Sequence, residues 1–410
     1  MGVRKLNKFL TNREIIRTYR NIQEFIVELK NEDRCNNNAH NGKIIIAIDF
    51  WLYAHKFLHS SRSDNILLGF WNQIMKFFSC GIIPLYVMDG SVPIEKQEKV
   101  DERNKKRQNY KKRINSINND IEKYININEL VIHPNNIFDQ TDPGNNDLFH
   151  DDIDGTEWTN NQNDLYQNDL YQNDNHVDEQ LSAMYEKKEK LQKHIKRIKT
   201  SELYNIHKLF DVLGVPYVRA EFEADALCAK LFKEKIITSC LSDDMDMLAL
   251  GCGSTIKFQD GRLVEFNMEQ IKEELQFTQE QFIDMCIMFG CDYLQHPFRL
   301  ECEEIYEMIK KHGSLLDALC SNEHELFNMS NSNVKVIGEH YYQVRDTYLS
   351  SYKKEYIPKD LLNFKMKPII FNDLIIFLKK LKWFDMSARN IRSLEIDIER
   401  INSMIQYDEL

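Results

Sequence analysis

Acidic residues recur in this chain at or near the ends of short apolar runs. An apolar run of four to eight residues is typical of a strand that is buried in a sheet. Ligands of open α/β sheets bind beyond the carboxyl ends of the strands, so acids placed there are expected to meet. The acids in question are Asp49, Asp89, Glu223, Asp225, Asp244, Asp246 and Asp292. Because these carboxylates would repel one another, the pattern predicts a site for hard divalent cations, two of them if every one of these acids faces it.

The N-terminal region, residues 1–123, alternates between helical and strand-like segments. In chain order the expected elements are a polar helix at 11–30, a strand at 43–49, a helix at 66–79, a strand at 82–88 and a long basic helix from Ile94. This alternation favours a parallel sheet with helical crossovers, which is expected to continue within residues 181–292. Apolar residues at helical spacing predict a mostly helical lobe over residues 293–410. The predicted fold class is therefore α/β with a C-terminal helical lobe.

Residues 124–180 differ from both flanks in composition. They are rich in Asn, Asp and Gln, and they contain the tandem repeat NDLYQ at 163–167 and 168–172. A segment this polar buries too little apolar surface to offset its ordering entropy, which predicts a disordered acidic insertion. An inert insertion and a regulatory or partner-binding role both remain open. One hypothesis is that the acidic loop competes with an anionic ligand for the basic segments on either side of it.

The charge of the chain is segregated along the sequence. The formal net charge is −11, yet basic residues concentrate at 96–113 and 187–199, which leaves local patches suited to phosphate contact. The nine cysteines form no CxxC pair and are expected to be reduced core thiols of an intracellular protein, in the nucleus or the cytoplasm. No apolar run is long enough to predict a membrane span.

Five motifs resemble the flap endonuclease/XPG family of structure-specific 5′ nucleases. In chain order they are MGVRKLNKFL, PLYVMDGSVPIEKQEKVDER, EFEADALCAKL, SDDMDMLALG and MFGCDYL. This resemblance implies a PIN-like central sheet with a helical arch, which basic helices at about 95–120 and 180–210 would form. Each motif alone is weak, but their order and spacing together are a strong signal. The asparagine-, isoleucine- and lysine-rich composition is also similar to that of divergent members from large DNA viruses and AT-rich protists.

The resemblance implies an activity and a set of site residues. It implies a Mg²⁺-dependent endonuclease, with Mn²⁺ as a substitute, that hydrolyses DNA at 5′ flaps or single/double-strand junctions in replication, repair or recombination. The acids named above would bind two metal ions, with Asp225 standing where the family has a longer Glu. Lys96 and Arg103 would act in catalysis by neutralising the phosphoryl oxygens. The implied DNA-binding residues are Gly2, His55, Lys96, Lys99, Arg103, Lys106 and Arg107.

Alternatives to this reading stay open at the level of the sequence. They are a 5′→3′ exonuclease or exoribonuclease of a related family, and a non-catalytic protein that binds DNA junctions. The chain is expected to be a monomer that binds branched or flapped DNA, without a membrane and without a recognisable sliding-clamp motif.

One part of the resemblance fails in the region after Asp292. The family has a glycine-rich helix-two-turn-helix there, which holds a K⁺ ion against duplex DNA. Here Glu301, Glu303 and Glu304 replace the glycines, whose backbone approaches phosphate closely. We therefore expect a degenerate helix-two-turn-helix without that K⁺ site, and altered or weaker binding of duplex DNA.

Overall fold

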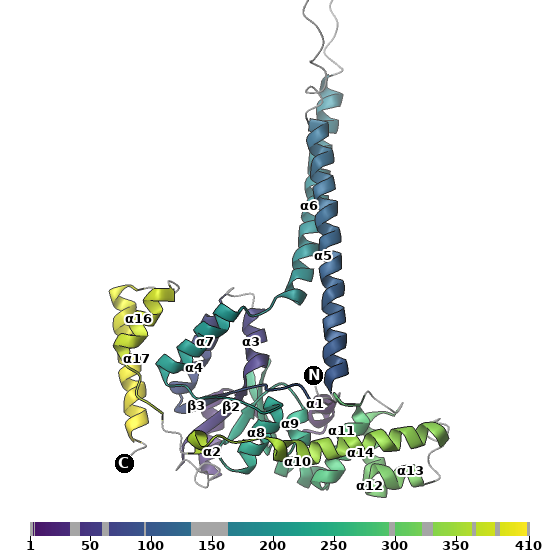
Figure 1. Cartoon of the computed structure of the whole chain (residues 1–410), viewed down its shortest axis with the longest axis vertical. Coiled ribbons are helices and arrows are strands. Elements are labelled where there is room, and N and C mark those ends of the chain that lie inside the picture. The colour runs from purple at the N-terminus through teal and green to yellow at the C-terminus, as the bar shows by residue number, and fades with distance from the viewer. Residues whose placement is uncertain are drawn as a thin grey trace, which may run out of the picture. The chain divides into compact units, whose positions relative to one another are not determined.

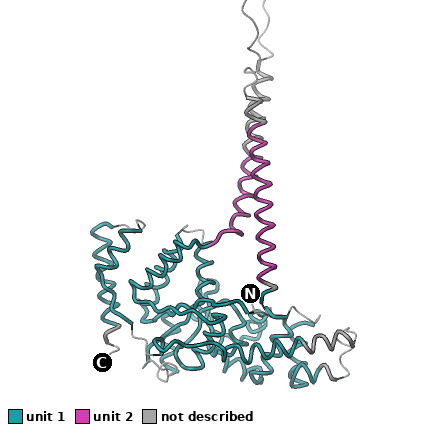
Figure 2. Tube along the Cα trace, viewed as in Figure 1, with its two compact units in different colours: residues 1–98, 198–410 teal, residues 99–197 magenta. Residues whose placement is uncertain are grey.

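The chain forms two compact units (Figure 2). One comprises residues 1–98 with 198–410 and contains the sheet, and the other comprises residues 99–197. The computed structural model describes residues 3, 5–32, 42–59, 65–93, 96–132, 163–294, 300–321, 331–362, 366–381 and 386–407. No helix in these ranges has the length and apolar character that crossing a membrane requires.

The larger unit contains a seven-stranded sheet whose strand order is β1-β7-β6-β5-β2-β3-β4. Figure 1 labels two of its strands, β2 and β3. The parallel strands are β6 (Ser254–Gln259), β5 (Ser239–Leu241), β2 (Ile44–Asp49), β3 (Ile82–Met88) and β4 (Tyr217–Arg219). Two antiparallel strands, β7 (Arg262–Asn267) and β1 (Arg17–Tyr19), complete one edge. The predicted α/β class is confirmed.

The chain order reverses between β2 and β5. From β2 the chain adds β3 and β4 on one side, whereas β5 and β6 lie on the other. The strands β2 and β5 pair directly, with Ile46 opposite Ser239 and Ile48 opposite Leu241. Ligand sites in open α/β sheets lie at such a reversal, so the carboxyl ends of β2 and β5 are where a site is expected.

Aromatic rings from four elements fix the helices to β3. Phe50 begins α3 (Phe50–Leu58), Phe70 lies in α4 (Ile66–Phe78), Tyr86 in β3 and Phe210 in α7 (Thr200–Leu213). All four side chains are fully buried, and the rings of Tyr86 and Phe210 stack with centroids 4.4 Å apart. Such ring pairs contribute about 0.5–1.5 kcal/mol beyond the area that they bury.

The helix predicted at 11–30 is wrong as a single element. The structure has α1 (Leu6–Asn12), strand β1 and α2 (Ile22–Asn31) in that region. The strand forms because Arg17 and Tyr19 pair with β7, and because the buried Tyr19 hydroxyl donates a hydrogen bond to Glu265 (2.9 Å). Tertiary pairing therefore overrides the local helical pattern.

The predicted helical region at the C-terminus is observed within the same unit as the sheet. Within residues 293–410 the described helices are α12 (Cys302–His312), α13 (Leu315–Cys320), α14 (Asn331–Lys354), α15 (Lys359–Leu362), α16 (Phe371–Leu381) and α17 (Ala388–Tyr407). Two further helices, α10 (Met268–Leu275) and α11 (Gln279–Phe289), precede them. The apolar run before Asp292 is α11, although the sequence suggested a strand. A capping box of Thr278 and Gln281 starts this helix, and its residues 282–289 are buried on every side, which hides the helical period.

The second unit is a pair of antiparallel helices, α5 (Gln97–Ile132) and α6 (Asn163–Ile195) (Figures 1 and 2). The ring of Tyr110, early in α5, stacks on that of His194, late in α6, with centroids 4.7 Å apart. The start of α5 therefore faces the end of α6. The core of the pair consists of Ile114, Ile117, Ile121 and Leu191, flanked by Tyr110, Ile125, Leu181, Met184 and Ile195. Spacings of three and four residues along both helices are typical of a coiled coil.

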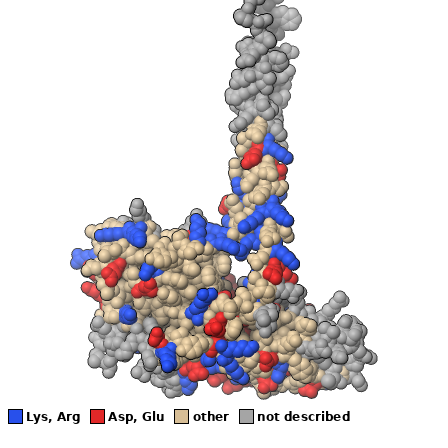
Figure 3. Space-filling view, viewed as in Figure 1, with Lys and Arg blue, Asp and Glu red and all other residues tan. Residues whose placement is uncertain are grey.

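These helices correct the prediction of a disordered loop at both margins of residues 124–180. The segments 124–132 and 163–180 are helical, and residues 133–162 lie outside the described part of the chain. The physical reason is that Ile125 and Leu181 pack onto the apolar seam, which extends the helices into polar sequence. On the face shown in Figure 3, groups of Lys and Arg side chains lie on the surface of this unit among other residues, some of them acidic. Lys105, Lys106 and Lys193 are exposed.

Replacing Ile117 by Ala should loosen the hairpin without unfolding the sheet. Ile117 is 8% exposed, and truncating a buried Ile costs about 2–5 kcal/mol, so local opening of the hairpin becomes more frequent. Hydrogen exchange should then accelerate in α5 and α6 but not in β2 and β3. The exposed Asn115→Ala is the control, and equal exchange in both variants would contradict the observed seam.

Candidate active site

The carboxylates predicted from the sequence meet at the carboxyl ends of the parallel strands. Asp49 ends β2, and Asp89 follows β3 directly. Glu223 and Asp225 lie at the start of α8 (Ala224–Lys233), and Asp246 starts α9 (Asp246–Ala249) two residues after Asp244. Asp292 follows α11. The structure therefore brings acids from five separate segments to one edge of the sheet.

Asp49 and Asp246 show how strongly this site disfavours negative charge. Burial raises the pKa of Asp49 to about 7, and the nearby charges of Asp89 and Asp244 add to that effect. Burial and the charge of Asp244 likewise raise the pKa of Asp246 to about 7. An acid with such a pKa is partly protonated at neutral pH unless a cation stabilises its charged form.

Asp225 and Asp244 belong to the same network of charges. Burial raises the pKa of Asp225 well above its ordinary value, and the charges of Asp244 and Asp49 act in the same direction. Burial is also the main reason that the pKa of Asp244 is raised. Asp292 contributes repulsion to both Asp244 and Asp246, so every predicted acid except Glu223 is part of this like-charge cluster.

Glu223 is connected to the cluster through Lys96. The Lys96 ammonium lies 2.6 Å from Glu223 Oε1, and the two side chains are only 20% and 13% exposed. Although burial alone lowers the pKa of Lys96, the neighbouring Tyr293, Glu223 and Asp225 raise it overall. The Tyr293 hydroxyl donates to Glu223 Oε2 (2.8 Å). Lys96 is therefore a firmly charged cation placed among the acids.

Backbone hydrogen bonds hold the segments that carry the acids. Asp49 Oδ1 accepts from the Leu52 amide (3.1 Å), and Asp89 Oδ1 accepts from the Ala224 amide (2.9 Å). The Gly90 amide donates to the Phe222 carbonyl (2.8 Å), and a Cβ at Gly90 would lie 2.2 Å from the Ala220 carbonyl oxygen. Glycine is needed here because the two loops approach so closely.

A buried glutamate from beyond α14 completes this support. The Glu355 carboxylate accepts hydrogen bonds from the amides of Glu221, Phe222 and Glu223, at 2.7, 3.1 and 3.1 Å. The side chain is only 3% exposed, so these three bonds replace water for both partners. Glu355 thus fixes the backbone that presents Glu223.

The residues at this edge fit a hard divalent cation. Asp225 Oδ1 and Asp246 Oδ2 are buried and lack a hydrogen-bond partner, which is costly for a carboxylate unless another ligand satisfies it. All the donors are carboxylate oxygens, the ligands that Mg²⁺ and Mn²⁺ prefer. Within the described part of the chain no group of three His, Cys, Asp or Glu side chains is drawn together tightly enough to hold an ion as it stands. Small side-chain movements toward a cation would be required.

The other predicted site residues are distributed over both units. His55 is exposed on α3, with its ring 6.3 Å from that of His59. Arg103 and Lys106 are exposed on α5 in the second unit, where burial and the charge of Arg197 lower the pKa of Arg107. Gly2 and the side chain of Lys99 lie outside the described residues. Their roles toward DNA stay predictions.

The glutamates after Asp292 pair with the N-terminal helix region. Glu301 is the N-cap residue of α12, and its amide donates to the Glu304 carboxylate (2.7 Å). The Glu301 carboxylate lies 3.6 Å from the Lys5 ammonium, while Glu303 binds the Arg13 guanidinium. These acids therefore neutralise nearby cations of the same unit. The expectation of a missing K⁺ site is compatible with these ion pairs and stays a prediction.

Two matches to family models decide the family. The model of the XPG N-terminal domain matches residues 1–110, and that of the XPG I-region matches residues 214–292. The chain belongs to the XPG/flap endonuclease family. The matched ranges contain every predicted carboxylate, Lys96 and Arg103, and they leave out most of the α5–α6 hairpin.

Curated relatives of this XPG-family chain include flap endonucleases. Flap endonuclease 1 of Trypanosoma cruzi is 30% identical over 48% of this chain and 49% of its own length. That of Enterocytozoon bieneusi is 25% identical over 77% of this chain and 71% of its own. A probable RAD2-like endonuclease of Invertebrate iridescent virus 6 is 25% identical over 71% and 70%. The chain thus spans only about half of the T. cruzi protein.

Solved structures share the fold of the chain. The catalytic core of Rad2 in complex with DNA substrate matches with a TM-score of 0.57 at 14% identity, over 98% of this chain and all of that one. Human GEN1 in complex with Holliday junction DNA matches with a TM-score of 0.54 at 14% identity, over 99% and 79%.

Three residues that contact the acids were not found from the sequence. Tyr293, Glu355 and Tyr348 bond Glu223, its backbone and Asp246 respectively. Tyr293 is adjacent to Asp292 within a recognised motif, which could have indicated it. The other two lie more than 100 residues away from their partners, and no local pattern indicates them.

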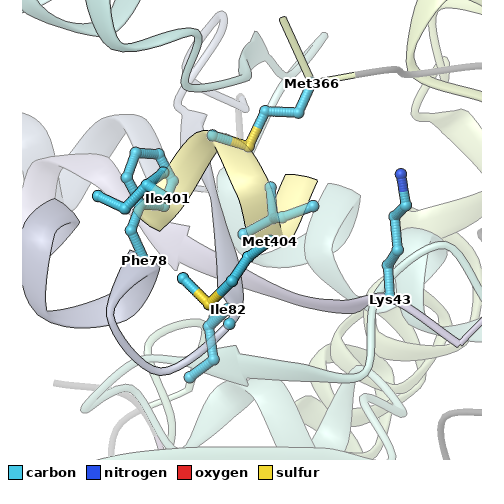
Figure 4. A pocket seen from close by; sticks show the side chains of 8 residues that line it. Lys43, Phe78, Ile82, Met366, Ile401 and Met404 are labelled. Carbon is cyan, nitrogen blue, oxygen red and sulfur yellow. The ribbon is translucent and has the colours of Figure 1, made fainter. Parts of the chain in front are cut away.

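A separate cavity of about 50 Å³, lined by Lys43, Ile82 and Met404, lies at the opposite ends of β2 and β3 (Figure 4).

Removing one acid should stabilise the metal-free protein at neutral pH. The folded-state pKa of Asp246 is raised, so its ionisation destabilises the fold progressively as pH rises from about 4 to about 7. Asp246→Asn removes that penalty, and we expect a gain of roughly 2 kcal/mol at pH 8 that disappears near pH 4. Urea unfolding in EDTA at both pH values measures it. A variant that is no more stable than the parent at pH 8 would contradict the described repulsion.

Proposed function

We propose that this chain is a structure-specific endonuclease that hydrolyses phosphodiester bonds in DNA at 5′ flaps or other junctions of single and double strands. The observation that carries the proposal is the cluster of repelling carboxylates around Lys96 at the switch point of the sheet. The names of the relatives, flap endonuclease 1 and RAD2-like endonuclease, support the same reaction. The process served would be DNA replication, repair or recombination.

The carboxylates would hold the metal ions of the reaction. Asp49, Asp225 and Asp246 gain most from a cation, because their charged forms are the most strongly disfavoured without one. Two Mg²⁺ ions at such a site supply a deprotonated water as the nucleophile and stabilise the leaving 3′ oxygen. Two-metal catalysis is part of the proposal and follows from the number of acids.

Lys96 would act on the phosphoryl group directly. Its ammonium is charged and paired with Glu223, so it is available to exchange this carboxylate for a phosphate oxygen when DNA binds. A preorganised cation stabilises the negative charge that develops on the phosphoryl oxygens. Tyr293, whose hydroxyl also holds Glu223, would keep that carboxylate in place after the exchange.

Two adjacent acids give a matched test of the proposal. Asp244 belongs to the carboxylate cluster, whereas its neighbour Asp243 is 40% exposed and pairs with Lys56 at 2.6 Å. Asp244→Ala should slow cleavage by about 100-fold or more, since a lost metal ligand removes several kcal/mol of stabilisation. Asp243→Ala should cleave within a few-fold of the parent, and both variants should retain DNA binding.

The assay uses end-labelled 5′-flap, nicked, bubble and single-stranded DNA in Mg²⁺. Incision near the flap junction that depends on Asp244 supports the proposal. A ladder of products from the 5′ end would instead indicate an exonuclease, and the same ladder on RNA would indicate an exoribonuclease. Binding of junctions without any cleavage by the parent would identify a non-catalytic junction-binding protein.

A further inference from the structure

Helix α14 presents a row of polar side chains to buried acids. Tyr341, Arg345 and Tyr348 are four and three residues apart, so they share one face of the helix. Tyr341 and Arg345 both bond Asp284 of α11, at 2.6 and 3.0 Å. One turn further along, Tyr348 bonds Asp246 of the carboxylate cluster instead. The same helix face therefore donates hydrogen bonds to one acid outside the carboxylate cluster and to one acid inside it.

The two carboxylate oxygens of Asp246 differ in their hydrogen bonding. The Tyr348 hydroxyl donates to Asp246 Oδ1 at 2.9 Å, and both side chains are buried, at 1% and 2% exposed. The other oxygen, Oδ2, is buried and has no hydrogen-bond partner. One oxygen is thus held by the protein, and the second is left for a ligand.

The ring of Tyr348 also contacts the second tyrosine of the site. Tyr293 and Tyr348 meet edge to face, with ring centroids 5.5 Å apart. The Tyr293 hydroxyl donates to Glu223, so each tyrosine restrains one acid while the rings restrain each other. Because rotation about two bonds sets the direction of a carboxylate, a fixed donor on one oxygen determines where the other points.

We propose that Tyr348 is a positioning residue that orients Asp246 so that its free oxygen binds a divalent cation. This inference rests on the proposed function, because it requires that the carboxylate cluster binds metal. Tyr348 touches neither DNA nor the cation, and it acts through Asp246. Partners of metal-binding carboxylates in this position typically alter metal affinity 10–100-fold when they are removed.

Tyr341 provides a matched control on the same helix. Its hydroxyl also bonds a buried aspartate, Asp284, which is 1% exposed, and Tyr341 itself is 1% exposed. Tyr341→Phe and Tyr348→Phe therefore each remove one oxygen atom and one buried hydrogen bond from α14. They differ in whether the aspartate that loses its donor belongs to the carboxylate cluster.

The decisive measurement is calorimetric titration of Mn²⁺ into the parent protein and both variants, with unfolding in EDTA as the measure of stability. We expect Tyr348→Phe to bind Mn²⁺ about 10-fold more weakly, and Tyr341→Phe, whose Asp284 keeps Arg345 as a donor, to bind within about twofold of the parent. In cleavage assays, excess Mn²⁺ should restore the rate of Tyr348→Phe without changing the KM for DNA.

The outcomes separate this inference from the proposed function. If the parent binds Mn²⁺ and Tyr348→Phe binds equally well, the positioning role is overturned and the proposed function is untouched. If the parent binds no Mn²⁺, both are overturned. If Tyr348→Phe does not fold, Mn²⁺ is titrated instead into Tyr348→His, which keeps a ring with an N–H donor but shortens its reach toward Asp246. A loss of about 10-fold in Mn²⁺ affinity supports the inference, and an unchanged affinity overturns it.

Discussion

The mutual repulsion of buried carboxylates at the junction of β2 and β5 is the constraint around which this molecule is organised. Desolvation and like charge both oppose ionisation there, so each acid needs a compensating donor or cation. Lys96 supplies one full positive charge, and amides at the starts of α3 and α8 supply partial ones. The burial that makes the cluster unstable in isolation is also what would make it selective for divalent cations.

Support for the cluster comes from segments that are distant in sequence. Asp89 bonds the first residue of α8, and Glu355 bonds three consecutive amides just before that helix. Loss of Glu355 would leave these three part-buried amides without their acceptor, and an unsatisfied group costs at most about 1–3 kcal/mol when it is fully buried. The C-terminal helices from α12 onward carry none of the acids, but this region of the chain stabilises the backbone of the site. This explains why they form one unit with the sheet.

The sequence was sufficient for the parts of the site that depend on local patterns. Acids after apolar strands, such as Asp49 and Asp89, could be placed because strand ends in a parallel sheet share one edge. Asp292 was assigned to the same edge for the wrong reason, since a uniformly buried helix such as α11 resembles a strand in composition. Tyr348 and Glu355 could not be found, because a hydrogen bond across more than 100 residues leaves no periodic trace. The short strand β1 was missed because only its pairing with β7 makes it extended.

The α5–α6 hairpin has an architectural consequence for the chain. In an antiparallel pair, residues near the two bases remain opposite each other whatever the length of chain between Ile132 and Asn163. Additions or losses at that point leave the stacking of Tyr110 on His194 and the seam around Ile117 in register. Changes in the length of the connection between the two helices therefore cost the sheet-containing unit little free energy.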